Sequence, residues 1–161
     1  SRTVLQSMTL ARPIGSWTRV LRIASKFCWL ILETSVSKYR VGMNRSFVAR
    51  HYLVGGNFGG EEEPHSHDYR VEVVVEGDTL DEHGFLVDIK KLEDELGRLV
   101  DRFENRMLND FPEFEGVNPG CEAFARVMAE NLRERLGGES ILALMVKIWE
   151  NEEAWASYRL P

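Results

Sequence analysis

The sequence contains few cysteines and no apolar run long enough to cross a membrane. Only two of its 161 residues are cysteine, Cys28 and Cys121, and they lie in segments of different character, which gives no disulfide framework. The apolar run at residues 27–32 is far too short to span a bilayer. We therefore expect a reducing, cytoplasmic setting and no membrane partner.

Acidic residues are almost missing from the start of the chain. Residues 1–42 carry seven Lys or Arg and one acid, Glu33, whereas the remainder carries 13 basic and 25 acidic residues, although the net charge of the whole chain is only −6. The excess of acidic residues after residue 42 argues against nucleic acid as a partner. The Ser- and Arg-rich start fits either a targeting presequence or an extension foreign to the natural protein, since Met43 would make a natural start.

Length and composition favour a single globular domain after this extension. The chain is 43% hydrophobic and 29% charged, as expected of a globular protein with its own core. Residues 1–42 are predicted to be a poorly packed extension, with a helix around residues 18–33. Residues 43–161 are predicted to form one domain.

Hydrophobic periodicity predicts an α+β fold with the order ββααββ. Strands are expected at 44–54, 66–77, 141–150 and 154–160, a helix from the N-cap Asp88 to about Asn109, and a second helix from Asn118-Pro119 to residue 136. This order gives a four-stranded antiparallel sheet with both helices on one face. The bare face and free edges favour oligomerisation into a barrel.

Three histidines fall in phase on the first two predicted strands. His51 shares a strand face with Phe47 and Ala49, and the His65-Ser66-His67 run places both of its histidines in phase with the valines that follow. Any one of them alone would more often be a core residue bonded to a backbone carbonyl. Three converging imidazoles suit a tetrahedral Zn²⁺ with one position open, because no fourth protein ligand is evident. His83, in a polar turn, is predicted to be a surface residue.

Six short motifs follow one another between Met43 and Leu160. They are Phe47-x-Ala49-x-His51, His65-x-His67, Gly84-Phe85-Leu86-Val87-Asp88, Leu108-Asn109-Asp110, Asn118-Pro119-x-x-Glu122 and Val146-x-Ile148-Trp149-Glu150 with Tyr158 downstream. The chain thereby resembles the 6-pyruvoyltetrahydropterin synthase and 6-carboxytetrahydropterin synthase (queuosine pathway) family of the T-fold superfamily. The resemblance implies Zn²⁺ on His51, His65 and His67, a pterin substrate at a subunit interface, and trimers stacked into hexamers.

Two glutamates are candidates for binding the substrate. Glu150 matches the glutamate that anchors the pterin in the family, and a carboxylate can accept the two adjacent N–H donors of a pterin. The alternative for Glu150 is an ordinary acid at a strand end. Glu122 is either a second binding residue or simply an acid placed favourably near a helix N-terminus.

The chain departs from the family where the proton carriers are expected. Glu61 stands at the position of the family's cysteine, and Glu104-Asn105 stands at the position of its Asp-His pair. A subgroup that resembles this chain also carries glutamate there and favours cleavage of the pterin side chain. Glu61 and Glu104 are therefore the candidate catalytic residues, although residues 61–63 could equally be a solvated acidic loop. Cys121 is predicted to be an inert, buried thiol.

The resemblance implies a zinc-dependent lyase acting on the side chain of dihydroneopterin triphosphate or a related pterin. Because Glu61 and Asn105 replace the usual proton-carrying residues, a second function is also possible. In this alternative the protein binds a pterin or purine as a sensor or accessory subunit without turnover. A purely structural zinc site is a third and weaker alternative, since such sites usually have four protein ligands.

Overall fold

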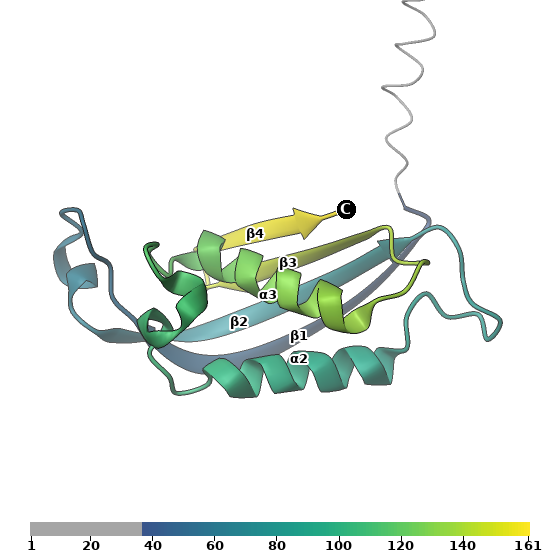
Figure 1. The fold of residues 1–161 in the computed structure, drawn as a ribbon, viewed down its shortest axis with the longest axis horizontal. Coiled ribbons are helices and arrows are strands. Elements are labelled where there is room, and N and C mark those ends of the chain that lie inside the picture. The colour runs from purple at the N-terminus through teal and green to yellow at the C-terminus, as the bar shows by residue number, and fades with distance from the viewer. Residues whose placement is uncertain (1–36) are drawn as a thin grey trace, which may run out of the picture. The chain divides into compact units, whose positions relative to one another are not determined.

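The computed structural model describes residues 37–161, which form a four-stranded antiparallel sheet and two helices (Figure 1). The strands lie side by side in the order β1-β2-β3-β4, and their sequence order is the same. The predicted ββααββ order is confirmed. The strands are β1 (Tyr39–His51), β2 (His65–Gly77), β3 (Ala143–Trp149) and β4 (Trp155–Leu160), and the helices are α2 (Ile89–Phe103) and α3 (Cys121–Leu136).

The first strand begins earlier than its hydrophobic pattern predicted. β1 starts at Tyr39 rather than at residue 44, because Tyr39 to Gly42 pair with Gly77 to Val74 of β2. Residues 39–42 thus belong to the sheet, although they were assigned to the extension. The predicted helix at 18–33 lies outside the described residues, and the nature of the extension stays a prediction.

Alternation along β1 and β2 places one face of the sheet in the core. Phe47 and Ala49 on β1 and Tyr69, Val71 and Val73 on β2 are all buried, while the residues between them are mostly exposed or half-buried. Burial of this apolar surface is the main force holding the sheet to its helices. Both helices cross the same face of the sheet, as Figure 1 shows.

Helix α2 is shorter than predicted. It begins after the expected N-cap Asp88, whose side chain accepts from the backbone N–H of Lys90, but it ends at Phe103 rather than near Asn109. Asn105 has a left-handed backbone (φ 57°), and its N–H donates to the carbonyl of Val48 over 2.7 Å. The chain leaves the helix here because its backbone bonds to β1 instead.

Helix α3 begins later than predicted. Gly120, rather than Asn118, is the N-cap residue, and the helix runs from Cys121 to the C-cap Gly137. No helix in residues 37–161 is long and apolar enough to cross a membrane. Three short 3-10 helices complete the described part, and they are η1 (Gly59–Glu62), η2 (Leu108–Asp110) and η3 (Pro112–Phe114).

The face of the sheet turned away from the helices, which we call the polar face, carries charged side chains together with apolar ones such as Met145 and Trp155. Glu76 on β2 is 8% exposed there, and its two oxygens contact Arg40 Nε of β1 at 3.0 Å and Arg159 Nη2 of β4 at 2.9 Å. This ion-pair cluster spans the sheet from one edge strand to the other. The barrel expected from the bare face and free edges stays a prediction.

Candidate functional site

The three in-phase histidines meet at the end of the β1–β2 pair. His51 pairs with His65 across the strands and Ala49 with His67, so that all three rings leave the same face of the sheet. The ring centroids lie 4.6 Å apart for His51 and His65, 4.7 Å for His65 and His67, and 5.0 Å for His51 and His67. The strand register alone therefore brings three imidazoles together.

Backbone carbonyls orient two of the rings. His51 Nδ1 is 2.9 Å from the carbonyl of Pro119, and His65 Nδ1 is 2.7 Å from the carbonyl of Glu63. A carbonyl can only accept, so each Nδ1 carries the proton and donates it, which leaves the Nε2 lone pair for another partner in the neutral ring. Burial lowers the pKa of His51, which favours this neutral form.

All three Nε2 atoms are buried and lack a hydrogen-bond partner among residues 37–161. An unpartnered buried nitrogen is costly, and three that face one point fit a metal ion, because neutral imidazole is a preferred ligand of Zn²⁺. His51, only 2% exposed, carries the argument best because water has least access to it. The donor atoms present in the chain thus fit the metal that the sequence predicted.

Glu61 joins this cluster from the loop between β1 and β2. Its Oε2 lies 2.9 Å from His65 Nε2 and 4.0 Å from His51 Nε2, although its angle to His65 is not that of a hydrogen bond. One ligand atom from each of Glu61, His51, His65 and His67 lies within 4.8 Å of all the others. The chain therefore offers a fourth ligand that its sequence did not suggest, because a long loop has to fold back to deliver it.

Two asparagines anchor the loop that carries Glu61. The Asn109 side chain accepts from the N–H of Tyr52 at 3.0 Å and donates to its carbonyl at 2.9 Å, and Asn118 does the same for Val54 at 2.8 and 3.0 Å. Leu53 N–H donates to the carbonyl of Glu61 over 2.8 Å. Asn109 follows α2 and Asn118 precedes α3, so the segment between the two helices fixes the start of this loop.

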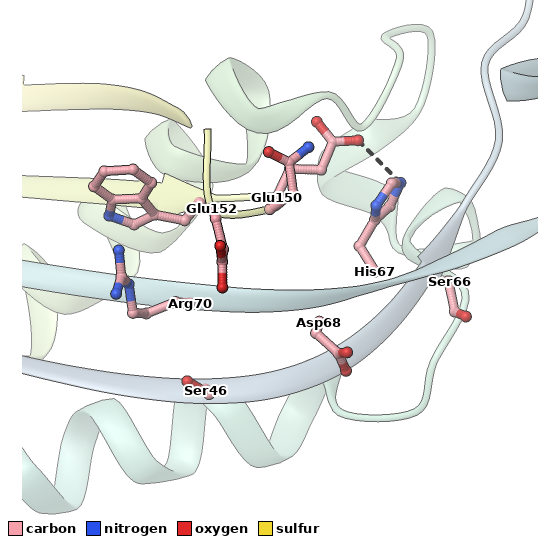
Figure 2. A pocket seen from close by; sticks show the side chains of 9 residues that line it. Ser46, Ser66, His67, Asp68, Arg70, Glu150 and Glu152 are labelled. Atoms are coloured by element: carbon pink, nitrogen blue, oxygen red, sulfur yellow. Dashed lines mark ion pairs between the residues drawn. The ribbon is translucent and has the colours of Figure 1, made fainter. Parts of the chain in front are cut away.

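Glu150 follows β3 and points into the same cluster. Its Oε1 lies 2.9 Å from His67 Nε2, as the dashed line in Figure 2 marks, and Cys121 Sγ donates to its Oε2 over 3.5 Å. Burial first, and then the nearby Glu150 carboxylate, raise the pKa of the Cys121 thiol to about 12. The thiol therefore stays protonated at neutral pH.

Two cavities share Glu150. The larger, of about 650 Å³, reaches from His67 to the polar face of the sheet, where the Arg70 guanidinium lies 4.5 Å from the Trp149 ring (Figure 2). The smaller, of about 380 Å³, lies between the loop, the start of α3 and the β3–β4 turn. It is lined by His51, Leu53, Glu61, Gly120, Cys121, Glu122, Glu150, Ala154, Trp155 and Ala156.

The predicted site residues are thus mostly gathered at one end of the sheet. Glu61, Glu122 and Glu150 line the smaller cavity with His51, whereas Glu104 lies exposed at the end of α2 and lines neither cavity. The contact between Cys121 and Glu150 was missed, because helical periodicity assigned Cys121 to the apolar stripe. His83 is on the surface, as predicted.

Solved structures with the same fold define the class of this protein. The chain matches 6-pyruvoyl tetrahydropterin synthase from Caenorhabditis elegans with a TM-score of 0.66 and 26% identity, over 78% of this chain and 99% of that one. The Plasmodium falciparum enzyme of the same name matches with a TM-score of 0.63 and 16% identity, over 77% and 98%. Fold and histidine cluster together are those of a T-fold protein with a site able to hold a metal.

Sequence comparison then gives the family. Residues 40–161 match the family model described as 6-pyruvoyl tetrahydropterin synthase, and the chain belongs to this family. It is 31% identical to dihydroneopterin monophosphate aldolase from Pyrococcus furiosus, over 72% of this chain and 93% of that one. It is 30% identical to 6-carboxy-5,6,7,8-tetrahydropterin synthase from Bacillus subtilis, over 61% and 68%. This is a family of pterin-processing T-fold proteins.

Proposed function

We propose that the protein is a zinc-dependent lyase that acts on the side chain of dihydroneopterin triphosphate or a closely related reduced pterin. The observation that carries the proposal is the convergence of three unpartnered Nε2 atoms, from His51, His65 and His67, within reach of Glu150. The names of the two sequence relatives, an aldolase and a synthase that take pterins, support this reading.

His51, His65 and His67 would hold the metal ion. Bound Zn²⁺ supplies Lewis acidity that polarises a hydroxyl or carbonyl oxygen of the side chain. The carbonyls of Pro119 and Glu63 keep the first two rings turned so that Nε2 faces the site. The metal ligands are therefore oriented before any substrate arrives.

Glu150 would bind the heterocycle. Its two oxygens can accept the ring N–H and the exocyclic amine of a pterin as a bidentate pair. It borders both cavities, so that a pterin held there would direct its side chain toward the histidines. Glu122 lines the smaller cavity at the first turn of α3 and is the second candidate contact.

Glu61 would move the proton that the family's cysteine moves elsewhere. Its carboxylate lies beside His65 and lines the smaller cavity, so it can accept a proton from a side-chain hydroxyl bound there. Glu104 lies outside both cavities and would act only from a second copy of the chain. The uncovered face of the sheet, its free edges and the family resemblance lead us to expect a homo-oligomer, a trimer or a hexamer. Light scattering would measure its mass.

The direct test is turnover. The protein loaded with Zn²⁺ would be incubated with dihydroneopterin triphosphate and, separately, with its monophosphate, and the pterin products separated by chromatography. We expect a product with a shortened or rearranged side chain. Absence of product with either compound under Zn²⁺ and other divalent metals would overturn the proposal.

A second candidate function has less support, because the names of both sequence relatives are those of enzymes. Glu61 stands where the family has a cysteine, and Asn105 stands where it has a histidine. Asn105 lines neither cavity, and its backbone N–H bonds to β1. A protein altered in this way could bind a pterin or purine as a sensor or accessory subunit. Tight binding that Glu150→Ala abolishes, without turnover in the unaltered protein, would select this alternative.

A further inference from the structure

Cys121 is the first residue of α3 and is half-buried in the smaller cavity. Its sequence neighbours predicted an inert thiol packed among apolar side chains. Its Sγ instead lies 3.5 Å from Glu150 Oε2, within the range of a weak sulfur hydrogen bond. The thiol therefore has a polar partner in the carboxylate that the proposed function assigns to the pterin.

Both oxygens of Glu150 have a close neighbour, but only one of them accepts a hydrogen bond. Oε1 lies 2.9 Å from His67 Nε2, and Oε2 accepts from Cys121. The His67 contact lacks hydrogen-bond geometry, and His67 Nε2 is the atom that would bind the metal, so its lone pair would then face the ion rather than Glu150. Once His67 binds the metal, Cys121 is the one of these two partners that still fixes Glu150.

We propose that Cys121 is a positioning residue, whose thiol donates to Glu150 Oε2 and keeps the carboxylate turned toward the cavity when the metal occupies His67. This inference rests on the proposed function, in which Glu150 accepts the N–H groups of the pterin. A carboxylate oriented in advance loses less side-chain freedom when the ligand binds, so pterin affinity depends on the thiol.

The chemistry of this thiol favours a donor over a nucleophile. Burial and the Glu150 carboxylate raise its pKa to about 12, and a protonated thiol is a poor nucleophile but keeps its S–H for donation. Cys121 is thus no replacement for the family's cysteine, whose position Glu61 occupies. Its role is to orient the binding group.

The first test measures the affinity of the zinc-loaded protein for neopterin by pterin fluorescence. We expect Cys121→Ala to weaken binding about tenfold and Cys121→Ser, which keeps a donor, to stay within about twofold of the unaltered protein. The affinity for Zn²⁺, from chelator competition, and the thermal midpoint should be unchanged in both variants. Equal neopterin affinity in Cys121→Ala and the unaltered protein, or no rescue by serine, would overturn the proposal.

The second test needs no pterin and thus separates this inference from the proposed function. The rate at which iodoacetamide alkylates Cys121, followed by peptide mass spectrometry, reports the thiolate fraction. Glu150→Gln should speed alkylation several-fold, because it removes the carboxylate that disfavours the thiolate, whereas Glu152→Gln should not. An unchanged rate in Glu150→Gln would mean that the thiol and the carboxylate are not coupled, whatever the protein binds.

Discussion

Two polar clusters lie at opposite ends of the β1–β2 pair, and they differ in how their buried atoms are satisfied. At the Tyr39 end, on the polar face, both oxygens of Glu76 are paired with arginines. At the His51 end, on the helix-covered face, three Nε2 atoms have no hydrogen-bond partner in the described part of the chain. Glu61 and Glu150 approach two of these nitrogens to 2.9 Å, but neither contact has hydrogen-bond geometry.

We interpret the difference as that between a structural cluster and the proposed metal site. A buried polar group normally finds a partner, because leaving it without one costs about 1–3 kcal/mol. The strands pair both oxygens of Glu76 at one end and leave three imidazole Nε2 atoms without a hydrogen bond at the other, which is the pattern expected if those nitrogens bind a ligand. The following predictions test this contrast, beginning with the largest effect.

Removing one histidine should abolish metal binding. His65→Ala takes away a ligand without opening the deep core, and we expect Zn²⁺ affinity to fall by more than about 100-fold, beyond the loss caused by changes outside the ligand set. Activity should be lost with it. Chelator competition measures the affinity, and Glu76→Gln is the matched control that should bind Zn²⁺ like the unaltered protein. Equal affinity in His65→Ala would remove the contrast between the two clusters.

Neutralising Glu61 should mainly affect turnover. Glu61→Gln keeps the size of the side chain but removes its basicity, and a general base typically contributes about 10²- to 10⁴-fold to the rate. We therefore expect kcat to fall within this range. Steady-state kinetics on the zinc-loaded protein measure it, with Glu62→Gln, one residue away and exposed, as control.

A large loss of Zn²⁺ affinity in Glu61→Gln would assign this carboxylate to the metal instead. Such a result would extend the unsatisfied cluster from three residues to four. It would also leave the proton-transfer step without its proposed carrier.

Neutralising Glu150 should weaken ligand binding rather than metal binding. Hydrogen bonds to a charged group contribute about 1.5–3 kcal/mol, so Glu150→Gln should weaken pterin binding by about 10- to 100-fold. Glu134→Gln is the control, because Glu134 is exposed on α3 and lines neither cavity. Isothermal titration with neopterin measures both, and an equal loss in the two variants would mean that overall negative charge, not the paired oxygens of Glu150, governs binding.

Disrupting the satisfied cluster should lower stability alone. Glu76→Gln breaks ion pairs whose arginine side chains are 59% and 55% exposed, so we expect a loss of only about 1 kcal/mol in the free energy of unfolding. Denaturant unfolding of the zinc-free protein measures it. A change in Zn²⁺ or pterin affinity would instead couple the two ends of the sheet.

The smallest effect concerns Asp81, at the same end as Glu76. Its side chain accepts from the backbone N–H groups of Phe85 and His83, and these bonds lower its pKa. A lowered folded-state pKa adds stability above the pKa of the unfolded chain, and this is lost as pH falls through the folded value. Asp81→Asn should therefore lower the thermal midpoint slightly at pH 7 and not at pH 2. Glu82→Gln is the charge-matched control.

Strand parity accounts for what could be predicted from sequence. The period of two along β1 and β2 placed His51, His65 and His67 on one face, and the structure confirms that their rings converge. Helical spacing likewise placed Leu92, Leu96, Leu99 and Phe103 of α2 in the core, because burial has a regular period in both kinds of element. Ile89 has the same spacing but is exposed, since it lies at the first position of the helix.

The missed features depend on contacts between distant residues. Helical periodicity could not end α2 at Phe103, because the cause is a backbone bond from Asn105 to Val48, 57 residues earlier. Nor could it bring Glu61 to the histidines, since no period governs the path of the loop after Val54. Glu61 was singled out from its aligned position, and its place in space came from the fold.

The hydrogen bonds of Asn109 and Asn118 suggest how the loop between β1 and β2 can vary among proteins of this fold. The side-chain amides of Asn109 and Asn118 bond to the backbone N–H and C=O of Tyr52 and Val54, as a neighbouring strand would do. The backbone after β1 is therefore held by hydrogen bonds as far as Val54. Residues 55–64 connect this anchored backbone to the first residue of β2, His65. The segment can then change in length and composition, exchanging one reactive side chain for another, while the imidazoles on the strands stay in register. Chimeras that swap residues 55–63 between relatives should keep the metal and alter the chemistry.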